Sequence, residues 1–400
     1  MSTWLVPAAD LTPDQQRAVE LSPRENRLIL GGPGSGKTQI LLHRAGFLRR
    51  AFNAHDDDYH VFVYTRILNE YIKSALDLLD LPETSVSTLD GWCYDYHERS
   101  IGPVPWNKAA KMPDFPAIRR AVACKARTGP PTYRFVLVDE GQDLTEDAFD
   151  VLKAIAGHIT VCMDFKQQIY DQGSTESQVR AYLGIRKENV TLLAHFRSCP
   201  YINLLAAQLL DQGERGMYLR QASGPIGERA TPLVYIATDA DDEKARLCEV
   251  VRGRLAKGER VAILVPYTRL LFGLARGLKE LGLDVEPVSR DLPNFGSDAP
   301  KVITYHSVKG LTFDSIFLPR LTSGAFHAWS DERIRKLIFV GISRAVNWVY
   351  LSTIGTTDLP IWDRILPLES QGYLTVQRSE LTLDLKDVAD DTGEEDAMPY

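Results

Sequence analysis

Short apolar segments alternate along the chain with longer segments in which apolar residues recur every three or four positions. The first pattern is typical of buried strands and the second of amphipathic helices. Runs such as FVLV and VAILV are apolar at every position, which indicates parallel strands covered on both faces. The predicted strands are 27–30, 59–64, 84–88, 133–139, 158–164, 231–237, 260–266, 301–306, 314–319 and 348–352. The predicted helices include 38–50, 66–79, 145–156, 200–211, 241–256 and 268–281.

This alternation of strands and helices predicts an α/β fold with parallel sheets. The strands fall into two groups, 27–164 and 231–352, so we expect two α/β domains. We place the first domain at 1–193, with a short helical insert at about 92–131, and the second at 194–375. We expect residues 376–400 to form an acidic, disordered tail.

Composition narrows the class of protein. The 400 residues are 44% apolar and 25% charged, which excludes a wholly disordered chain and a fibre. No apolar run reaches the roughly 18 residues that a membrane span needs, and the first residues lack the pattern of a secretory signal. The five cysteines form no close pair, so we expect reduced thiols and a cytoplasmic protein.

The net charge of −7 needs to be divided along the chain. Residues 380–400 hold eight acids and one lysine, so residues 1–379 sum to zero. A neutral body is compatible with nucleic-acid binding, because a groove needs local positive charge only. For the tail, the alternatives to plain disorder are a peptide that binds a basic protein surface and a shield over a groove.

A glycine-rich segment, GGPGSGKT at 31–38, lies between a predicted strand and a predicted helix. Strand, glycine turn and helix form the context of a phosphate-binding loop, whose backbone N–H groups and helix start bind phosphates. We therefore predict that the protein binds ATP and Mg²⁺, with Lys37 reaching the β- and γ-phosphates and Thr38 ligating the metal. The loop residues predicted to bind nucleotide are Gly32, Gly34, Ser35, Gly36, Lys37 and Thr38.

Two acids follow directly after the apolar run 135–138. Asp139 is predicted to anchor Mg²⁺, and Glu140 to polarise the attacking water. Two acids in this position would otherwise be interpreted as a solvated helix start. The complete phosphate loop upstream favours the catalytic interpretation.

The motifs together resemble those of superfamily 1 helicases of the UvrD/Rep/PcrA type. Six segments carry the resemblance: LTPDQ (11–15), VDEGQD (138–143), MDFKQQIYD (163–171), LLAHFRS (192–198), VITYHSVKGLTFDSIFL (302–318) and DERIRKLIFVGISRA (331–345). They are similar, in this order, to the family's Q motif and motifs II to VI. The resemblance implies two tandem RecA-like P-loop NTPase domains with the ATP site in the cleft between them.

The resemblance also implies roles for individual residues. Gln15 takes the place of the glutamine that reads adenine, and Gln167 that of the glutamine coupling γ-phosphate to DNA. Arg197 and Arg344 match the two arginine fingers, and Gly310 joins the nucleotide-binding set. Contacts to the single-strand backbone are implied for Thr65, Arg66, Thr88, Thr304 and His306. For Thr65 and Thr88 the competing interpretation is that each hydroxyl caps the helix after its strand.

The chain departs from the family in places that bear on function. Gln172 stands where relatives carry a base-stacking aromatic, and Thr312 stands where they carry the glutamate of KGLEF. The two inserted subdomains of the larger relatives are reduced to about 92–131 and to the segment DLPNFGSD at 291–298. We therefore expect a compact motor core.

Two functions remain open. The first is an ATP-dependent helicase or translocase, an ATP hydrolase that moves on single-stranded DNA, 3′ to 5′ as the resemblance implies. The second is an ATP-driven regulatory subunit that controls a partner nuclease or other effector. A small-molecule kinase is disfavoured, because four of the motifs would then have no role.

Overall fold

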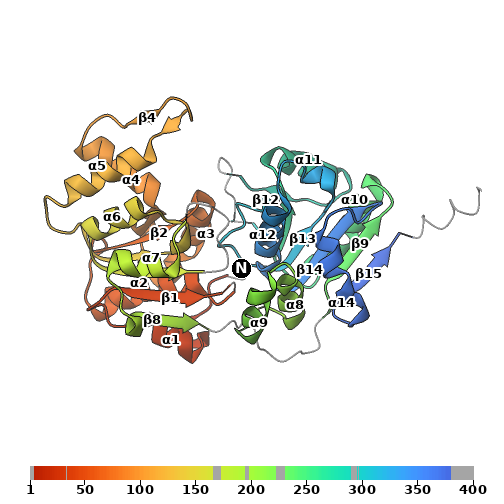
Figure 1. The fold of residues 1–400 in the computed structure, drawn as a ribbon, viewed down its shortest axis with the longest axis horizontal. Coiled ribbons are helices and arrows are strands. Elements are labelled where there is room, and N and C mark those ends of the chain that lie inside the picture. The colour runs from red at the N-terminus through yellow and green to blue at the C-terminus, as the bar shows by residue number, and fades with distance from the viewer. Residues whose placement is uncertain are drawn as a thin grey trace, which may run out of the picture.

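Two large parallel sheets dominate the computed structural model, which describes residues 4–32, 34–164, 173–193, 198–221, 230–289, 295 and 297–379 (Figure 1). The strands of the first sheet lie in the order β3 (Val86–Thr88), β2 (Tyr59–Val63), β6 (Tyr133–Val138), β7 (Ala156–Met163), β1 (Arg27–Gly31) and β8 (Val190–Leu193). Those of the second lie in the order β11 (Glu286–Pro287), β12 (Lys301–Thr304), β10 (Val261–Val265), β13 (Phe313–Leu318), β14 (Ala345–Ile354), β9 (Leu233–Ala237) and β15 (Thr375–Arg378).

Helices follow most of these strands along the chain, as parallel connections require. Those belonging to the first half are α1 (Pro13–Val19), α2 (Lys37–Ala51), α3 (Arg66–Leu76), α4 (Leu89–Ser100), α5 (Phe115–Ala126), α6 (Glu146–Ile155) and α7 (Glu176–Leu183). Those of the second half are α8 (Pro200–Ala207), α9 (Gln212–Gln221), α10 (Ala240–Leu255), α11 (Thr268–Glu280), α12 (Asp331–Ile342), α13 (Ile361–Ile365) and α14 (Pro367–Ser370). The predicted α/β fold with parallel sheets is confirmed.

Side chains on the central strands are buried alternately on the two faces of each sheet. In β6, Phe135 and Leu137 belong to one apolar cluster, whereas Val136 and Val138 belong to another. Because both faces are covered, the strand appears in the sequence as an unbroken apolar run. The sequence pattern and the layered packing therefore have the same cause.

One apolar cluster contains residues from both sheets, including Leu137 of β6 and Ile303 of β12. Across the junction, the ring of Tyr71 on α3 meets that of Phe295 edge-on, with ring centroids 5.1 Å apart. The hydroxyl of Tyr71 donates a hydrogen bond of 3.4 Å to the carbonyl of Thr312. The two sheets are thus joined by apolar packing as well as by polar contacts.

The predicted insert at about 92–131 consists of α4 and α5 joined by a small antiparallel hairpin of β4 (Trp106–Asn107) and β5 (Met112–Pro113). The hairpin projects from the first half, at the upper left of Figure 1. Trp106 is 58% exposed, and Lys108 and Lys111 at the turn are exposed as well. The insert therefore presents an exposed aromatic and two charges at its tip.

Three strands of the two large sheets lie where the sequence pattern did not indicate them, and one of these is β11 beside β12. β8 adds to the first sheet beside β1, and β15 adds to the second beside β9. β15 extends to Arg378, so the second sheet includes three residues that were assigned to the tail. Residues 380–400, where the acids lie, are outside the described residues. In the described ranges, none of the helices is long and apolar enough to cross a membrane.

A buried polar network lies beneath the first sheet. The guanidinium of Arg44 on α2 donates to the carbonyls of Val19 and Leu21 at 2.9 and 2.7 Å, and to the hydroxyl of Thr160 at 2.9 Å. It also lies 3.3 Å from Nε2 of His158. Burial, with the charge of Arg44, lowers the pKa of His158 to about 3. The network ties α1 and α2 to β7 and holds His158 neutral.

His158 should make the protein acid-sensitive. Between pH 6.5 and 3 the unfolded state binds a proton that the folded state does not, so the free energy of unfolding falls as the pH falls. One such group contributes about 1.4 kcal/mol per pH unit across that window. In urea titrations, His158→Gln should show a shallower pH dependence than the parent, whereas His55→Gln, at an exposed position, should not. Equal slopes for the parent and His158→Gln would contradict this expectation.

Candidate nucleotide-binding site

The phosphate loop connects β1 to α2 at the carboxyl edge of the first sheet. Gly34 and Gly36 have φ values of 76° and 83°, in the left-handed region that glycine adopts without strain. A Cβ on Gly36 would also lie 2.6 Å from the amide nitrogen of Gln15. Ser35 is buried, and its hydroxyl donates to the carbonyl of Gly32 at 2.9 Å. The predicted loop residues that the structure describes therefore form a tight turn that leads into a helix start.

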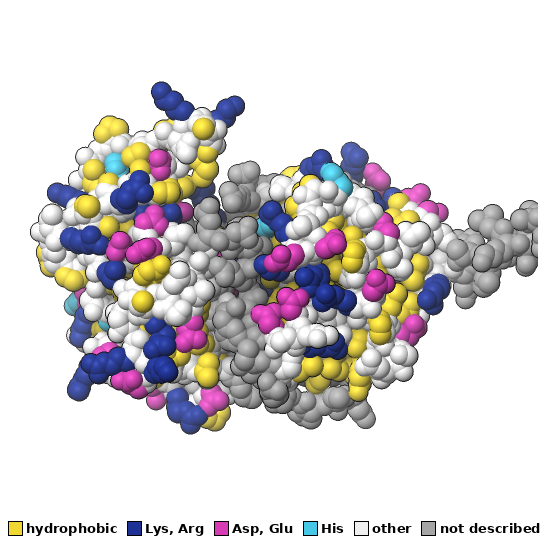
Figure 2. Space-filling model, in the orientation of Figure 1, with side chains coloured by type: hydrophobic (Ala, Val, Ile, Leu, Met, Phe, Trp, Pro, Cys, Tyr) yellow, Lys and Arg dark blue, Asp and Glu magenta, His cyan; other side chains and the backbone are white. Residues whose placement is uncertain are grey.

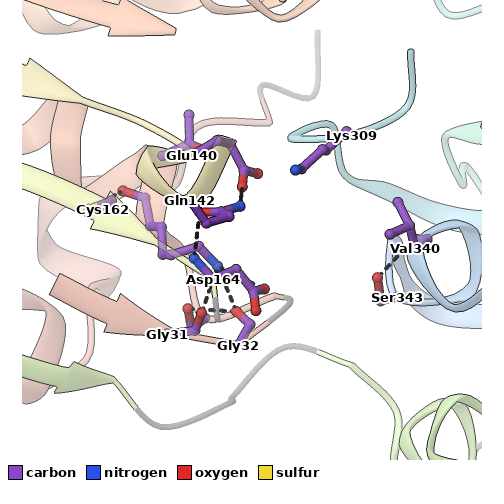
Figure 3. Close-up of polar contacts among 12 residues, drawn as sticks. Gly31, Gly32, Glu140, Gln142, Cys162, Asp164, Lys309, Val340 and Ser343 are labelled. Atoms are coloured by element: carbon purple, nitrogen blue, oxygen red, sulfur yellow. Dashed lines mark hydrogen bonds and ion pairs between the residues drawn. The ribbon is translucent and has the colours of Figure 1, made fainter. Parts of the chain in front are cut away.

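Lys37 lies inside this loop. Its ammonium group donates to the carbonyls of Gly31 and Gly32, both at 2.9 Å, and lies 3.3 Å from the carboxylate of Asp164 (Figure 3). The side chain of Asp164 is completely buried at the end of β7. The ammonium group is thus held where the loop turns, with a buried acid as its counter-charge.

The two predicted magnesium ligands lie together. The hydroxyl of Thr38, at the start of α2, donates to the carboxylate of Asp139 at 2.5 Å. Asp139 follows β6, the strand two places from β1 in the sheet. Burial, with the adjacent charge of Glu140, raises the pKa of Asp139. A hydroxyl and a carboxylate, both oxygen donors, form a set that suits Mg²⁺, which takes few protein ligands and keeps its waters and the substrate phosphates.

Glu140 has an unusual backbone conformation and lies among charged side chains. Its φ of 55° and ψ of 43° place a non-glycine residue in the left-handed region. Burial alone would raise the pKa of its carboxyl group, but Lys309, Lys37 and Arg344 outweigh burial and hold the pKa below its ordinary value. Glu140 is therefore a buried, ionised carboxylate aimed by a strained turn.

Gln142 links three parts of the site, a role that sequence reasoning missed. Its amide nitrogen donates to the carboxylate of Glu140, and its amide oxygen accepts from the backbone N–H of Asp164 at 2.8 Å. Figure 3 shows Gln142 between Glu140 and Asp164. Gln142 and Asp164 both lie in quoted motifs, and Asp164 follows an apolar strand just as Asp139 does. The position of Asp164 directly after an apolar strand could therefore have indicated its place in the site.

Gln15 contacts the phosphate loop. Its amide oxygen accepts from the backbone N–H of Thr12 at 3.0 Å, which closes a capping box at the start of α1. Its amide nitrogen donates to the carbonyl of Ser35 at 3.0 Å. In this structure Gln15 positions the loop, and its predicted contact to adenine stays a prediction.

Residues of the second half complete the site. Lys309, between β12 and β13, forms an ion pair with Asp143, and both side chains are almost fully buried. Burial raises the pKa of Asp143, and Lys309 opposes that rise. Gly310, with φ of 82°, passes so close to α3 that an added Cβ would lie 2.7 Å from Leu68. Figure 3 shows Lys309 directed from the second half toward Glu140 and Gln142.

A narrow pocket is lined from both sides of this junction. The first half contributes Gly34, Gly36, Lys37, Thr38 and Glu140, among others, and the second contributes Gly310, Thr312 and Arg344. Burial lowers the pKa of Arg344, while Glu140, Asp164 and Asp139 act against that effect. Arg344 is therefore a buried cation in the field of these three acids. The predicted Gln167 and Arg197 lie outside the described residues.

The residues predicted to bind nucleic acid lie at the strand ends of both sheets. Thr65 and Thr88 are the N-caps of α3 and α4, and their hydroxyl oxygens accept from backbone N–H groups at 3.0 and 3.2 Å. The competing interpretation of capping is therefore confirmed for both. Capping uses the hydroxyl as an acceptor, so its O–H remains available as a donor. Arg66 is exposed beside Thr65.

The remaining two predicted residues follow β12. The hydroxyl of Thr304 donates to that of Ser307 at 2.9 Å and accepts its backbone N–H at 3.2 Å. The ring of His306 lies against Trp329 instead of extending alone into solvent.

Comparison with known proteins agrees with this geometry for the first half. A family model described as "AAA domain" matches residues 15–172, a segment that contains Gln15, the phosphate loop and both acids after β6. With the parallel sheets, this match supports a P-loop NTPase fold for the first half of the chain. No curated protein sequence matches the chain.

One solved structure is similar at a low level. It is the C-terminal domain of a possible DNA helicase from Lactobacillus plantarum WCFS1, which is 17% identical and aligns with a TM-score of 0.37. The alignment covers 46% of this chain and 99% of that one. At this score the likeness carries no argument about fold or function.

The Lys309–Asp143 ion pair gives a direct test of the junction. Lys309→Met leaves Asp143 buried without its cation, which should lower the free energy of unfolding by about 3–5 kcal/mol. The control is Lys336→Met, which removes a lysine whose side chain is 48% exposed and should change stability by about 0.5 kcal/mol or less. Urea unfolding measures both. Equal stability of the two variants would mean that the pair does not hold the junction.

Proposed function

We propose that the protein is an ATP-driven motor that acts on single-stranded DNA. The observation that carries the proposal is the pocket to which both sheets contribute. Lys37, Thr38 and Glu140 line it from one side, and Gly310 and Arg344 line it from the other. A nucleotide bound there would contact both halves, so its hydrolysis would change how they are held together.

The chemistry proposed is hydrolysis of the γ-phosphate. The ammonium of Lys37 would exchange the loop carbonyls for phosphate oxygens, as the phosphate loop of such enzymes does. The ionised carboxylate of Glu140 would orient the attacking water and accept its proton. Thr38 and Asp139 would hold Mg²⁺, which supplies positive charge to the phosphates when bound.

In this proposal, ATP hydrolysis is coupled to movement of the two halves through the cations of the second half. Arg344 is a permanent charge close enough to act on the pKa of Glu140, so it suits a transition state with charge on the phosphoryl oxygens. Lys309 pairs with Asp143, four residues after Asp139 in the chain. Closure of the junction and completion of the catalytic site would then be one event.

Nucleic-acid binding is supported by a broad trough beside the nucleotide pocket. The trough has a volume of about 680 Å³, and its walls include Tyr64, Thr88 and Arg119 of the first half with Arg333 and Lys336 of α12. Figure 2 shows basic and acidic side chains interspersed over the visible face, not gathered into one basic patch. Four acids, Asp90, Asp139, Asp143 and Glu332, line the trough as well, and Arg119 and Lys336 form ion pairs with acids. The groups that suit a phosphate backbone are therefore Arg333 and the hydroxyl at the start of α4.

At a finer level we propose a compact superfamily 1 motor of the UvrD/Rep/PcrA type. The proposal includes two RecA-like domains, at 1–193 and 194–375, and movement in the 3′ to 5′ direction. It rests on the six motifs quoted above. The alternative is an ATP-driven regulatory subunit whose closure controls a partner such as a nuclease. The small insert favours that alternative, because α4, α5 and a hairpin of two two-residue strands offer little surface for a duplex.

Glu140→Gln tests the proposed chemistry. The variant keeps the shape of the side chain but loses the base, so ATP should still bind while hydrolysis slows on the order of 10²-fold or more. The control is Glu146→Gln, which changes an exposed acid on the next helix and should hydrolyse ATP normally. Binding of a fluorescent nucleotide and phosphate release provide the two measurements. Unchanged turnover in Glu140→Gln would remove this mechanism.

The motor and the regulatory alternative differ in their response to DNA. For the motor, single-stranded DNA should stimulate ATP hydrolysis, and its affinity should fall about ten-fold between low and physiological salt. Unaided displacement of a long duplex should be slow, because opening each step needs about 1.4 kcal/mol and the insert is small. No stimulation by single strands would favour the regulatory subunit, and rapid processive displacement would show that larger inserts are dispensable.

A further inference from the structure

Three aromatic side chains meet at the carboxyl edge of the second sheet. Tyr267 follows β10, His306 follows β12, and Trp329 lies in the loop between β13 and α12. The ring centroids of Tyr267 and His306 lie 4.9 and 5.7 Å from that of Trp329. All three residues are half-buried, so part of each side chain faces solvent.

Two exposed arginines lie on these rings. The guanidinium carbon of Arg269 is 5.1 Å from the ring centroid of Tyr267, and that of Arg333 is 5.6 Å from the ring centroid of Trp329. Both distances are within the range of cation–π attraction. The cluster thus combines flat apolar surfaces with positive charge at its rim.

The cluster also packs against the core of the second half. Trp329 does rest on the buried ring of Phe326, with centroids 5.6 Å apart, and so covers part of the core. The hydroxyl of Tyr267, however, is buried and has no hydrogen-bond partner among the described residues. A buried hydroxyl without a partner is costly. The core tyrosines Tyr59, Tyr305 and Tyr350 share this state, so the hydroxyl of Tyr267 does not by itself indicate a ligand.

The cluster is continuous with the trough described above. Arg333, which lies on Trp329, also lines the trough, together with Lys336 one turn further along α12. The opposite wall of the trough carries Thr88 at the start of α4. Because Arg333 belongs to both, the trough and the rings are neighbouring parts of one surface.

We propose that Trp329, with Tyr267 and His306, forms a stacking platform for an unpaired base, and that Arg269 and Arg333 bind the phosphates beside it. The proposal rests on the proposed function, since it adds a base contact to a single-strand motor.

The chemistry of the platform determines what it binds. Every base has a flat π-face, so stacking tolerates any base but requires that it be unpaired. Burial, with the charge of Arg333, holds the pKa of His306 below its ordinary value, so the ring is neutral at physiological pH. The platform should therefore favour single strands over duplex without reading sequence.

Binding of a fluorescein-labelled oligothymidylate, followed by anisotropy, tests the platform. Trp329→Ala should weaken binding about ten-fold, because it removes one base–aromatic stack. Trp329→Phe should bind within about three-fold of the parent, since a ring remains. Trp106→Ala, which removes the exposed tryptophan of the hairpin, serves as the matched control and should bind normally.

An abasic oligonucleotide of the same length separates stacking from charge. It keeps the phosphates but offers no bases, so the parent and Trp329→Ala should bind it equally. Arg333→Gln should weaken binding to both strands, because a phosphate contact does not need the base. An equal loss for Trp329→Ala on the two strands would overturn the proposal, since it would indicate a general change of shape.

A measurement on the unaltered protein covers the case in which Trp329→Ala fails to fold. Oligonucleotides carrying 5-iodouracil crosslink on irradiation to aromatic rings stacked on the modified base. Peptide mapping should place the crosslink on Trp329, Tyr267 or His306, and crosslinks confined to other segments would overturn the platform. If the parent protein binds no single strand, the proposed function fails. If it binds and Trp329→Ala binds equally well, only the platform fails.

Discussion

The burial of opposite charges where the two sheets meet is the constraint on which the rest of the structure depends. Three cations and four acids lie in this junction: Lys37, Lys309, Arg344, Asp139, Glu140, Asp143 and Asp164. A charge removed from water is tolerated only when it is paired or hydrogen-bonded. The cations of the second half and the acids of the first therefore need one another. Separating the halves would break the pair between Lys309 and Asp143 and would take Arg344 away from Glu140, whereas Lys37 and Asp164 pair within the first half.

This charge balance explains why the site is formed by the ends of strands. Asp139 and Asp164 follow β6 and β7, and Lys309 follows β12. In a parallel sheet all carboxyl ends lie at one edge, so a few loops bring distant residues together. Gln142 then holds the acids of the first sheet in register with one another.

The features predicted from sequence are those that depend on neighbouring residues. The central strands and the phosphate loop were recognisable because their apolar runs and glycines lie in one continuous segment. The pairing of Lys309 with Asp143 spans 166 residues, and no local pattern indicates it. The same holds for Trp329 and Tyr267, which meet only through the order of strands in the second sheet. For Thr65 and Thr88 the local sequence is informative but ambiguous, because a helix cap and a phosphate contact favour the same residue type.

The left-handed backbone of Glu140 has a consequence for how this protein can change. An L-residue in that conformation is less stable than glycine by about 1–2 kcal/mol. The fold would thus be better served by glycine at a position where the proposed chemistry needs a carboxylate. Stability and catalysis therefore oppose each other at residue 140. A selection for more thermostable variants would therefore favour glycine at residue 140, and such variants would be inactive. Stabilising substitutions at other positions would not have this conflict.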